Sequence, residues 1–263
     1  MSTSNQKPNY GNWVSLALMK IFAIVIAVLC IAEILSLFFL GSIASVVILI
    51  ILSAALAMTF YMWRCRVLFD FDKGGVMGEI HEYHVQHLSW NGKGRLLDIG
   101  CGAGALTIRC AKKFPKAELV GMDYWGTGWS YAKEQCERNA FIEGVAKRIV
   151  FQKGDAANLD FYDGSFDAAV SNFVFHEVRS QPDKRKVVKE ALRTVKKGGT
   201  FAFQDMFSQE NLYGNMEEFV EELRKDGIHE INYIPFVEKQ GFIPKFVQAP
   251  WMLHGVGLIY GVK

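Results

Sequence analysis

The sequence has few charged residues near its beginning and almost no net charge overall. Of its 263 residues, 29 are Lys or Arg and 27 are Asp or Glu, which gives a formal net charge of +2. A nucleic-acid binder that works by neutralising phosphates needs a larger basic excess, so that class of function is excluded. Hydrophobic residues make up 51% of the chain, which excludes an intrinsically disordered protein.

Cysteine is also scarce, and its spacing excludes a disulfide scaffold and a cysteine-based metal site. No Cys-x-x-Cys pair occurs, as is typical of a reduced, cytosol-facing domain. His81, His84 and His87 follow one another at intervals of three, but such steps drift round a helix and no Cys or carboxylate completes a site. We therefore expect no bound metal. The five cysteines are Cys30, Cys65, Cys101, Cys110 and Cys136.

The first 63 residues contain only three charged side chains, Lys7, Lys20 and Glu33. Residues 43–63 form an uncharged run without proline, and residues 21–40 precede it with Glu33 as their only charge. A single helix through both runs would be about 63 Å long, roughly twice the thickness of the hydrocarbon core. The sequence therefore predicts a transmembrane helical hairpin. A buried helical hairpin in a soluble protein is the alternative, whereas the apolar stretch is too long for a cleaved signal peptide.

Positive charges flank this hairpin but are absent from its turn. Lys7 and Lys20 lie before it, and Arg64 and Arg66 follow it. Since positive flanks stay on the cytoplasmic side, we expect a protein with two spans whose globular domain is cytoplasmic. Glu33 lies about 10 Å of helix from the turn. It is either a functional intramembrane carboxylate or a protonated or interface-reaching side chain.

The remainder of the chain alternates strand-like and helix-like segments with short connections. This order predicts an α/β fold with a parallel, doubly wound sheet covered on both faces. Two final strand candidates have no helix between them, so we expect them to pair antiparallel. The predicted strands are residues 95–99, 118–123, 148–153, 166–172 and 200–204, followed by the pair 242–248 and 254–262.

A glycine-rich turn follows the first of these strands. Gly100-x-Gly102-x-x-Ala105, with Asp123 downstream, satisfies the fingerprint of a dinucleotide-binding loop. Asp98 lies beside the loop, where its carboxylate would repel a pyrophosphate but would suit an ammonium or sulfonium group. S-adenosylmethionine carries both of these groups and no phosphate. The charge therefore favours S-adenosylmethionine over a nicotinamide dinucleotide.

Over about residues 74–263 the sequence resembles the class I methyltransferases that depend on S-adenosylmethionine. Residues 97–104 look like the first motif of that family, and residues 120–123 like its second strand, whose terminal acid holds the ribose hydroxyls. Residues 154–156 are similar to the motif in which Asp contacts the adenine amino group. Residues 165–170 look like the fourth strand, and residues 192–199 like the turn before the fifth, with Lys197 where proline is usual.

The resemblance implies a seven-stranded, mostly parallel sheet that ends in an antiparallel hairpin and is preceded here by the transmembrane hairpin. It divides the chain into an N-terminal tail (1–12), the transmembrane hairpin (13–63, with helices at about 16–40 and 43–63), a juxtamembrane linker and helix (64–94) and a methyltransferase domain (95–263). An NAD(P)-dependent oxidoreductase and a non-catalytic module that binds S-adenosylmethionine are the alternatives. The cofactor-binding residues that the resemblance implies are Asp98, Gly100, Gly102, Gly104, Asp123, Tyr124, Asp155, Ala156 and Asn172.

The loop after the fourth strand borders the transferring methyl group in this family. His176 in that loop is the candidate general base, because imidazole titrates near neutral pH. A structural histidine is the alternative, and Asp205 is a weaker second candidate that could instead be a cap. Phe173 and Val174 replace the prolines of the methylases that act on exocyclic amines of bases, so we expect no nucleic-acid substrate. The membrane hairpin favours a small or lipid-like acceptor such as a lipid or a quinone.

Overall fold

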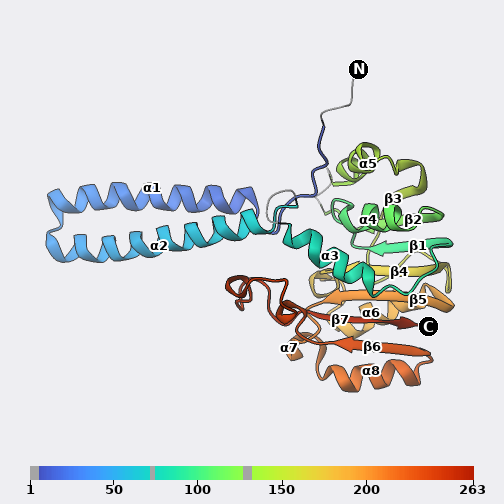
Figure 1. The fold of residues 1–263 in the computed structure, drawn as a ribbon. Helices are drawn as coiled ribbons and strands as arrows, with labels where there is room; N and C mark the ends of the chain where they lie inside the picture. The colour runs from blue at the N-terminus through green and yellow to red at the C-terminus, as the bar shows by residue number, and fades with distance from the viewer. Residues whose placement is uncertain (1–5, 72–74, 127–131) are drawn as a thin grey trace. The chain divides into compact units, whose positions relative to one another are not determined.

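The computed structural model describes residues 6–71, 75–126 and 132–263 (Figure 1). Its chain forms two compact units. One consists of residues 11–78 and is helical, and the other combines residues 79–263 with the N-terminal segment that ends at Tyr10. The two units are described separately below.

The helical unit is a pair of long apolar helices, α1 (Leu16–Phe39) and α2 (Ser42–Leu68). Helix α1 begins at Ser15, whose hydroxyl accepts a hydrogen bond from the backbone N–H of Leu18 at 3.1 Å. Gly41 connects the helices with a φ of +82°, a value that favours glycine. Both helices are long and apolar enough to cross a membrane.

Helix α2 continues past Trp63, where the apolar run ends. Arg64, Cys65 and Arg66 remain helical, because arginine is a good helix former and no glycine or proline interrupts the segment. The guanidinium of Arg66 donates to the backbone carbonyl of Val14, which ties the end of α2 to the residues before α1. This hydrogen bond therefore connects the end of α2 to the segment before α1, at the end of the helical pair opposite the turn at Gly41.

The second unit is built on a sheet with the strand order β3-β2-β1-β4-β5-β7-β6. Neighbouring strands from β3 to β5 are parallel, whereas β7 is antiparallel to both β5 and β6. This confirms the predicted seven-stranded, mostly parallel sheet with a terminal antiparallel hairpin. The strands are β1 (Gly94–Ile99), β2 (Ala117–Asp123), β3 (Ile149–Lys153), β4 (Phe166–Asn172), β5 (Val195–Asp205), β6 (Glu230–Ile234) and β7 (Gly257–Val262).

Helices cover both faces of the sheet because its strands are apolar on both sides. Leu97 and Ile99 of β1 belong to the buried cluster that includes the apolar stripes of α6 and α8. Asp98 alternates with them and meets Thr107 of α4 on the other face. The helices of this unit are α3 (Val76–Gln86), α4 (Ala105–Lys113), α5 (Ala132–Ile142), α6 (Lys184–Arg193), α7 (Glu210–Tyr213) and α8 (Met216–Lys225), with α3 beginning in the helical unit.

One strand of the terminal hairpin lies elsewhere than predicted. Residues 242–248 do not form a strand, and their only regular element is the 3-10 turn η4 (Lys245–Val247). The partner of β7 is instead β6, whose five residues precede Pro235. Pro244 lies inside the predicted strand, and the missing N–H of proline disfavours a paired strand there. The prediction for 242–248 was therefore wrong, although the hairpin itself is confirmed.

The N-terminal segment packs on the second unit. The backbone N–H of Asn9 donates to the side-chain oxygen of Asn139 at 2.8 Å, and the Asn139 amide donates back to the Asn9 carbonyl at 2.7 Å. The same amide also donates to the carbonyl of Ala103 in the glycine loop at 3.0 Å. Asn139 of α5 therefore connects the start of the chain to the loop that precedes α4, and this part of the predicted tail is ordered against the domain.

Candidate functional site

The sheet reverses its order of connection between β1 and β4, which lie side by side although β2 and β3 come between them in the chain. In open α/β sheets a crevice forms at such a point, outside the carboxyl ends of the strands, and ligands bind there. Asp123, Asn172 and Asp205 end β2, β4 and β5 at this edge. We call it the cofactor edge.

The glycine loop after β1 is shaped by three left-handed residues, Gly100, Gly102 and Gly104, with φ values of +72°, +55° and +82°. A Cβ atom on Gly100 would lie 2.2 Å from Cγ2 of Val174, so only glycine lets the loops after β1 and β4 approach this closely. A Cβ atom on Gly102 would meet no atom within 4 Å. The loop is therefore tightly packed at its base and open above Gly102, as a ligand that approaches the backbone requires.

Asp123 holds the open part of this loop in place. Its carboxylate accepts the backbone N–H of Gly102 at 2.8 Å and that of Trp125 at 3.0 Å. The Trp125 indole N–H donates to the Gly102 carbonyl at 3.2 Å, and its ring is buried. Since a carboxylate has about four acceptor positions, Asp123 retains capacity for two hydroxyl groups. Trp125 therefore also stabilises the glycine loop, through the hydrogen bond from its indole N–H.

Asp98 lies beneath the glycine loop and is fully buried. Its carboxyl accepts the hydroxyl hydrogen of Thr107 at 2.5 Å. Burial, aided by the nearby charge of Asp123 and opposed by the Thr107 hydrogen bonds, raises the pKa of Asp98 to about 7. The carboxyl is therefore poised between its neutral and charged forms at neutral pH, and a cation near the loop would favour the charged form.

The remaining predicted cofactor residues lie at the same edge. Asp155 accepts the backbone N–H of Ala157 at 2.9 Å and the Ser180 hydroxyl at 3.0 Å, while the neighbouring Ala156 is buried. Asn172 accepts a hydrogen bond from the Gln204 side chain at 3.0 Å. The backbone turns sharply after Asn172. The structure thus brings residues from β1, β2, β3 and β4 together, as predicted for a single site.

Tyr124 is an exposed residue among those predicted to bind the cofactor. Its side chain is 62% exposed, and the Lys153 ammonium lies 5.5 Å from its ring centroid. The ring follows directly on Asp123 in the chain. Its role in covering a ligand stays a prediction.

His176 and Asp205 form a hydrogen-bonded pair at the cofactor edge. Nδ1 of His176 lies 2.7 Å from Oδ1 of Asp205, and the His176 side chain is 18% exposed. Asp205 is fully buried, and its other oxygen accepts the backbone N–H groups of Val174 and Phe175 at 2.9 and 2.7 Å. The carboxylate therefore fixes both the loop and the imidazole, leaving Nε2 as the ring nitrogen that can act as a base.

The surroundings of His176 favour its charged form. Burial lowers the pKa of His176, but the hydrogen bond and charge of Asp205, together with the charge of Glu177, outweigh burial, so the pKa is raised above 6.5. Burial and the Asp205 charge raise the pKa of Tyr213 as well. The Tyr213 hydroxyl therefore stays protonated beside the pair.

The pairing of His176 with Asp205 could not be read from spacing alone. The sequence places both residues after strands, but only the adjacency of β4 and β5 brings them together. Thr107, which contacts Asp98, shows no sequence signal beyond its place one turn into α4. A polar residue that follows a glycine loop by a few positions is the pattern that would have identified it.

His81 and His84 lie in α3, and His87 directly follows its last residue. Nε2 of His84 lies 2.7 Å from the carbonyl of Ala202, and Nδ1 of His87 lies 2.8 Å from that of Tyr83. Burial lowers the pKa of His81 to about 3 and that of His84 to about 4, so both rings are neutral. Within residues 6–71, 75–126 and 132–263, no group of three or more His, Cys, Asp or Glu side chains is arranged to hold a metal ion.

These features fit S-adenosylmethionine. Open space lies above Gly102, and Asp123 has acceptor capacity for a ribose. Asp98 beneath the loop complements a cationic ligand. The fold and this site define a class I methyltransferase domain that depends on S-adenosylmethionine.

The comparisons with known proteins agree with this class. Residues 97–203 match the family model described as a methyltransferase domain. The matched range runs from Leu97 in β1 to Phe203 in β5 and includes every predicted site residue except the second candidate, Asp205. The domain is therefore a methyltransferase domain, and S-adenosylmethionine is its cofactor.

Several curated methyltransferases are similar over part of their length. Sterol 24-C-methyltransferase erg6 of Aspergillus fumigatus is 34% identical over 122 residues, which cover 46% of this chain and 30% of that protein. Demethylmenaquinone methyltransferase of Thermotoga maritima is 30% identical over 112 residues, covering 43% of each. The chain thus spans less than half the length of these relatives.

Solved structures share the fold. Geranyl diphosphate C-methyltransferase from Streptomyces coelicolor, solved with S-adenosyl-L-homocysteine, has a TM-score of 0.52 and 16% identity, covering 71% of this chain and 79% of that one. The [4+2]-cyclase SpnF has a TM-score of 0.53 and 19% identity, covering 70% of this chain and 79% of that one. At these identities the likeness concerns the fold alone.

The raised pKa of Asp98 predicts a pH-dependent stability. Because the folded-state pKa of about 7 exceeds the ordinary value of 3.8, the protonated carboxyl stabilises the fold below about pH 4, and this stabilisation is lost as pH rises through 7. Between about pH 5 and 6.5 the wild type should lose about 2 kcal/mol relative to Asp98→Asn, which cannot ionise, and above about pH 8 the difference should stay constant. Thermal unfolding of the full chain in detergent measures this difference. Asp226→Asn, an exposed change, is the control, and parallel pH curves for wild type and Asp98→Asn would contradict the assignment.

Proposed function

We propose that the protein is a membrane-anchored methyltransferase that moves the methyl group of S-adenosylmethionine to a small, lipid-like acceptor. The proposal of a membrane anchor rests on which side chains of α1 and α2 are buried and which are exposed. Their buried side chains are Ser36, Ser45 and Cys65, whereas most of their large apolar side chains are exposed. A helix buried in a soluble core has the opposite pattern, so this surface calls for a hydrocarbon environment.

Polar contacts between the two helices support the same interpretation. The Ser45 hydroxyl of α2 donates to the carboxylate of Glu33 in α1, and the Ser36 hydroxyl donates to the other oxygen of that carboxylate at 3.3 Å. Within a membrane, a carboxyl group is tolerated where it is turned toward a neighbouring helix and hydrogen-bonded. Through the hydrogen bond from Ser45, Glu33 connects α1 to α2.

The orientation follows from the positive charges at the open end of the helical pair. Lys20 lies in the first turns of α1, and Arg64 and Arg66 lie in the last turns of α2. The turn at Gly41 carries no positive charge. By the positive-inside rule both ends of the anchor, and the methyltransferase domain with them, are cytoplasmic.

The anchor also favours an apolar acceptor. An active site held near a bilayer meets substrates dissolved there at a raised effective concentration. Two relatives are named for apolar acceptors, a sterol and demethylmenaquinone. Others are named for arsenite and for the alkaloid ajmaline, so the relatives alone do not define the acceptor. The membrane anchor is what favours a lipid or a quinone.

The cofactor, when bound, supplies an electrophilic methyl group on a positively charged sulfur. For this chain, Asp123 and the glycine loop would hold the ribose, and Asp155 and Ala156 the adenine. Asn172 and the left-handed Phe173 (φ +57°) place the loop after β4 next to the glycine loop. Alignment and exclusion of water are then the main contributions of the protein to transfer.

His176 would receive the proton that the acceptor loses. Asp205 accepts the Nδ1 hydrogen, which leaves Nε2 free of hydrogen and able to remove a proton from the acceptor atom as the new bond to the methyl carbon forms. The negative charge of Asp205 then stabilises the imidazolium. On this basis we propose His176 as the general base and Asp205 as its positioning residue.

Replacing His176 should abolish transfer without removing the cofactor. The full chain, reconstituted in vesicles of its own membrane lipids, should move labelled methyl groups into organic-extractable product. His176→Ala should lower this rate about 100-fold or more, with an unchanged affinity for S-adenosylmethionine in calorimetry. His229→Ala, an exposed histidine before β6, is the matched control. Unchanged turnover in His176→Ala would refute the assignment of the base.

The Asp205 charge should set the pH dependence of the reaction. Because a base must be unprotonated, kcat/KM should fall as pH drops through the raised pKa of His176, above 6.5. Asp205→Asn removes the charge that raises this pKa, so the acid limb should move to lower pH while the maximal rate falls. Asp167→Asn, near the opposite edge of the sheet, should leave the limb in place. An acid limb that Asp205→Asn does not move would show that His176 is not the titrating base.

A further inference from the structure

The segment between the last two strands, residues 235–256, lies at the cofactor edge, and we call it the edge loop. Strands β5 and β6 both pair antiparallel with β7, so β6 runs parallel to β5 and ends at the edge where Asp205 lies. The loop is fastened to the residues that follow Asp205. The backbone N–H of Ser208 donates to the Gly255 carbonyl at 2.9 Å, and the N–H of Phe236 donates to the Ser208 hydroxyl at 3.2 Å.

The interior of the edge loop is packed, which gives the loop a defined shape. Ile243, Val247 and Leu253 are buried. The backbone N–H of Leu253 donates to the Val247 carbonyl at 3.0 Å, and the Gln248 amide donates to the Ile243 carbonyl at 2.9 Å. The side chains that the loop exposes are therefore held by a folded base.

Those exposed side chains are aromatic and cationic. Trp251 is 66% exposed and Phe236 36% exposed. The ammonium of Lys239 lies 4.1 Å from the centroid of the Phe236 ring. Single exposed apolar residues are ordinary in soluble proteins, but a segment that exposes both tryptophan and lysine side chains is typical of a membrane–water interface.

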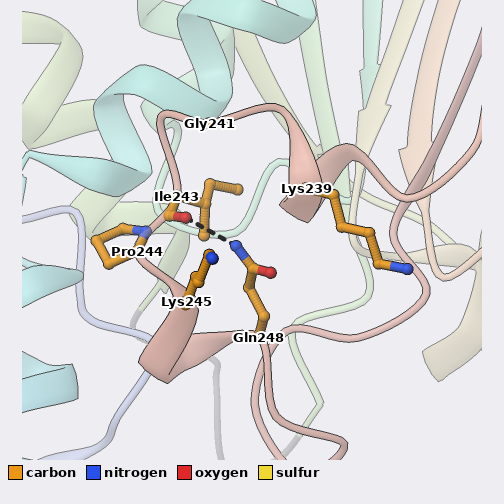
Figure 2. A pocket seen from close by; sticks show the side chains of 6 residues that line it. All are labelled: Lys239, Gly241, Ile243, Pro244, Lys245 and Gln248. Atoms are coloured by element: carbon orange, nitrogen blue, oxygen red, sulfur yellow. Dashed lines mark hydrogen bonds between the residues drawn. The ribbon is translucent and has the colours of Figure 1, made fainter.

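The exposed charge of the edge loop is of one sign. Glu238 is its only acid, and it is buried, with its carboxylate accepting the backbone N–H groups of Gly255 and Val256 at 2.9 and 3.1 Å. Lys239 and Lys245 are exposed. Figure 2 shows both lysines beside a hollow of about 480 Å³. The hollow is lined by Lys239, Gly241, Ile243, Pro244, Lys245 and Gln248.

We propose that the edge loop binds the headgroup layer of an anionic lipid bilayer. Trp251 enters the layer at the level of the headgroups, and Lys239 and Lys245 bind lipid phosphates. The proposal rests on the membrane-anchored methyltransferase proposed above. Its consequence is that the cofactor edge, with His176, faces the bilayer that contains a lipid-like acceptor.

Fluorescence of Trp251 tests this contact. The full chain is reconstituted in lipid nanodiscs whose acyl chains carry bromine, a quencher of tryptophan, with phosphatidylcholine alone or with added phosphatidylglycerol. The signal of Trp251 is the difference between the wild type and Trp251→Phe. We expect strong quenching of Trp251 in the anionic discs. The double variant Lys239→Glu with Lys245→Glu should lower the fraction of molecules whose edge loop is bound to lipid about fivefold or more. Lys116→Glu with Lys225→Glu, exposed lysines near the opposite edge, should not change it.

Three results would overturn the proposal. In the first, Trp251 is unquenched in anionic discs, and in the second it is quenched equally in both kinds of disc. The third comes from adding a soluble quencher: Trp251 is then shielded only as protein concentration rises. That result would assign the loop to contact with a second copy of the chain. The signal of Trp63 in α2, obtained with Trp63→Phe, reports the anchor in the same samples. An unquenched Trp63 would reject the membrane anchor itself, whereas a quenched Trp63 with an unquenched Trp251 would reject the edge loop alone.

Discussion

Parallel pairing of β1 with β2 on one side and β4 on the other is the constraint on which the rest of the structure depends. Parallel neighbours end at one edge, so this pairing brings the glycine loop, Asp123 and Asn172 to the same edge of the sheet. The close approach of Val174 to Gly100 follows from the same adjacency. Strand β7, antiparallel between β5 and β6, keeps β6 parallel to the others and so adds the edge loop to that edge. The cofactor edge, the His176–Asp205 pair and the edge loop are in this way different consequences of one strand order.

Buried or half-buried carboxylates at that edge differ in the groups that they hold. Asp98 is hydrogen-bonded by Thr107, and its burial raises its pKa to about 7, a shift that a cationic ligand would oppose. Asp123 accepts two backbone N–H groups and fixes the glycine loop. Asp205 accepts hydrogen bonds from backbone N–H groups and from the His176 imidazole, so it holds both a loop and a titratable ring. Each aspartate ends or precedes a turn, but its partners differ: a hydroxyl for Asp98, backbone N–H groups for Asp123, and backbone N–H groups with an imidazole for Asp205.

The sequence was informative where local patterns determine structure. The glycine loop after β1 and the acid at the end of β2 could be placed from the sequence, because strand–turn–helix patterns are local, whereas their hydrogen bond could not. The predicted strand at 242–248 was wrong because hydrophobic residues around Pro244 pack inward from a loop, and apolar alternation does not distinguish this from a strand. The length of α2 was underestimated because apolar runs end at Trp63 while helical hydrogen bonding continues to Leu68. The Asp205–His176 pair depends on which strands are neighbours, a non-local property that spacing along the chain does not contain.

Calorimetric titration of the full chain in detergent with S-adenosylmethionine, and separately with NADH, tests the central claim most directly. We expect S-adenosylmethionine to bind and NADH to produce no binding heat. Asp123→Ala should weaken the affinity about tenfold or more, since it removes hydrogen bonds to a charged acceptor and releases the glycine loop. Glu118→Ala, an exposed acid at the other end of β2, should bind as the wild type does. Binding of NADH without S-adenosylmethionine, or an Asp123→Ala variant with wild-type affinity, would contradict the cofactor site described above.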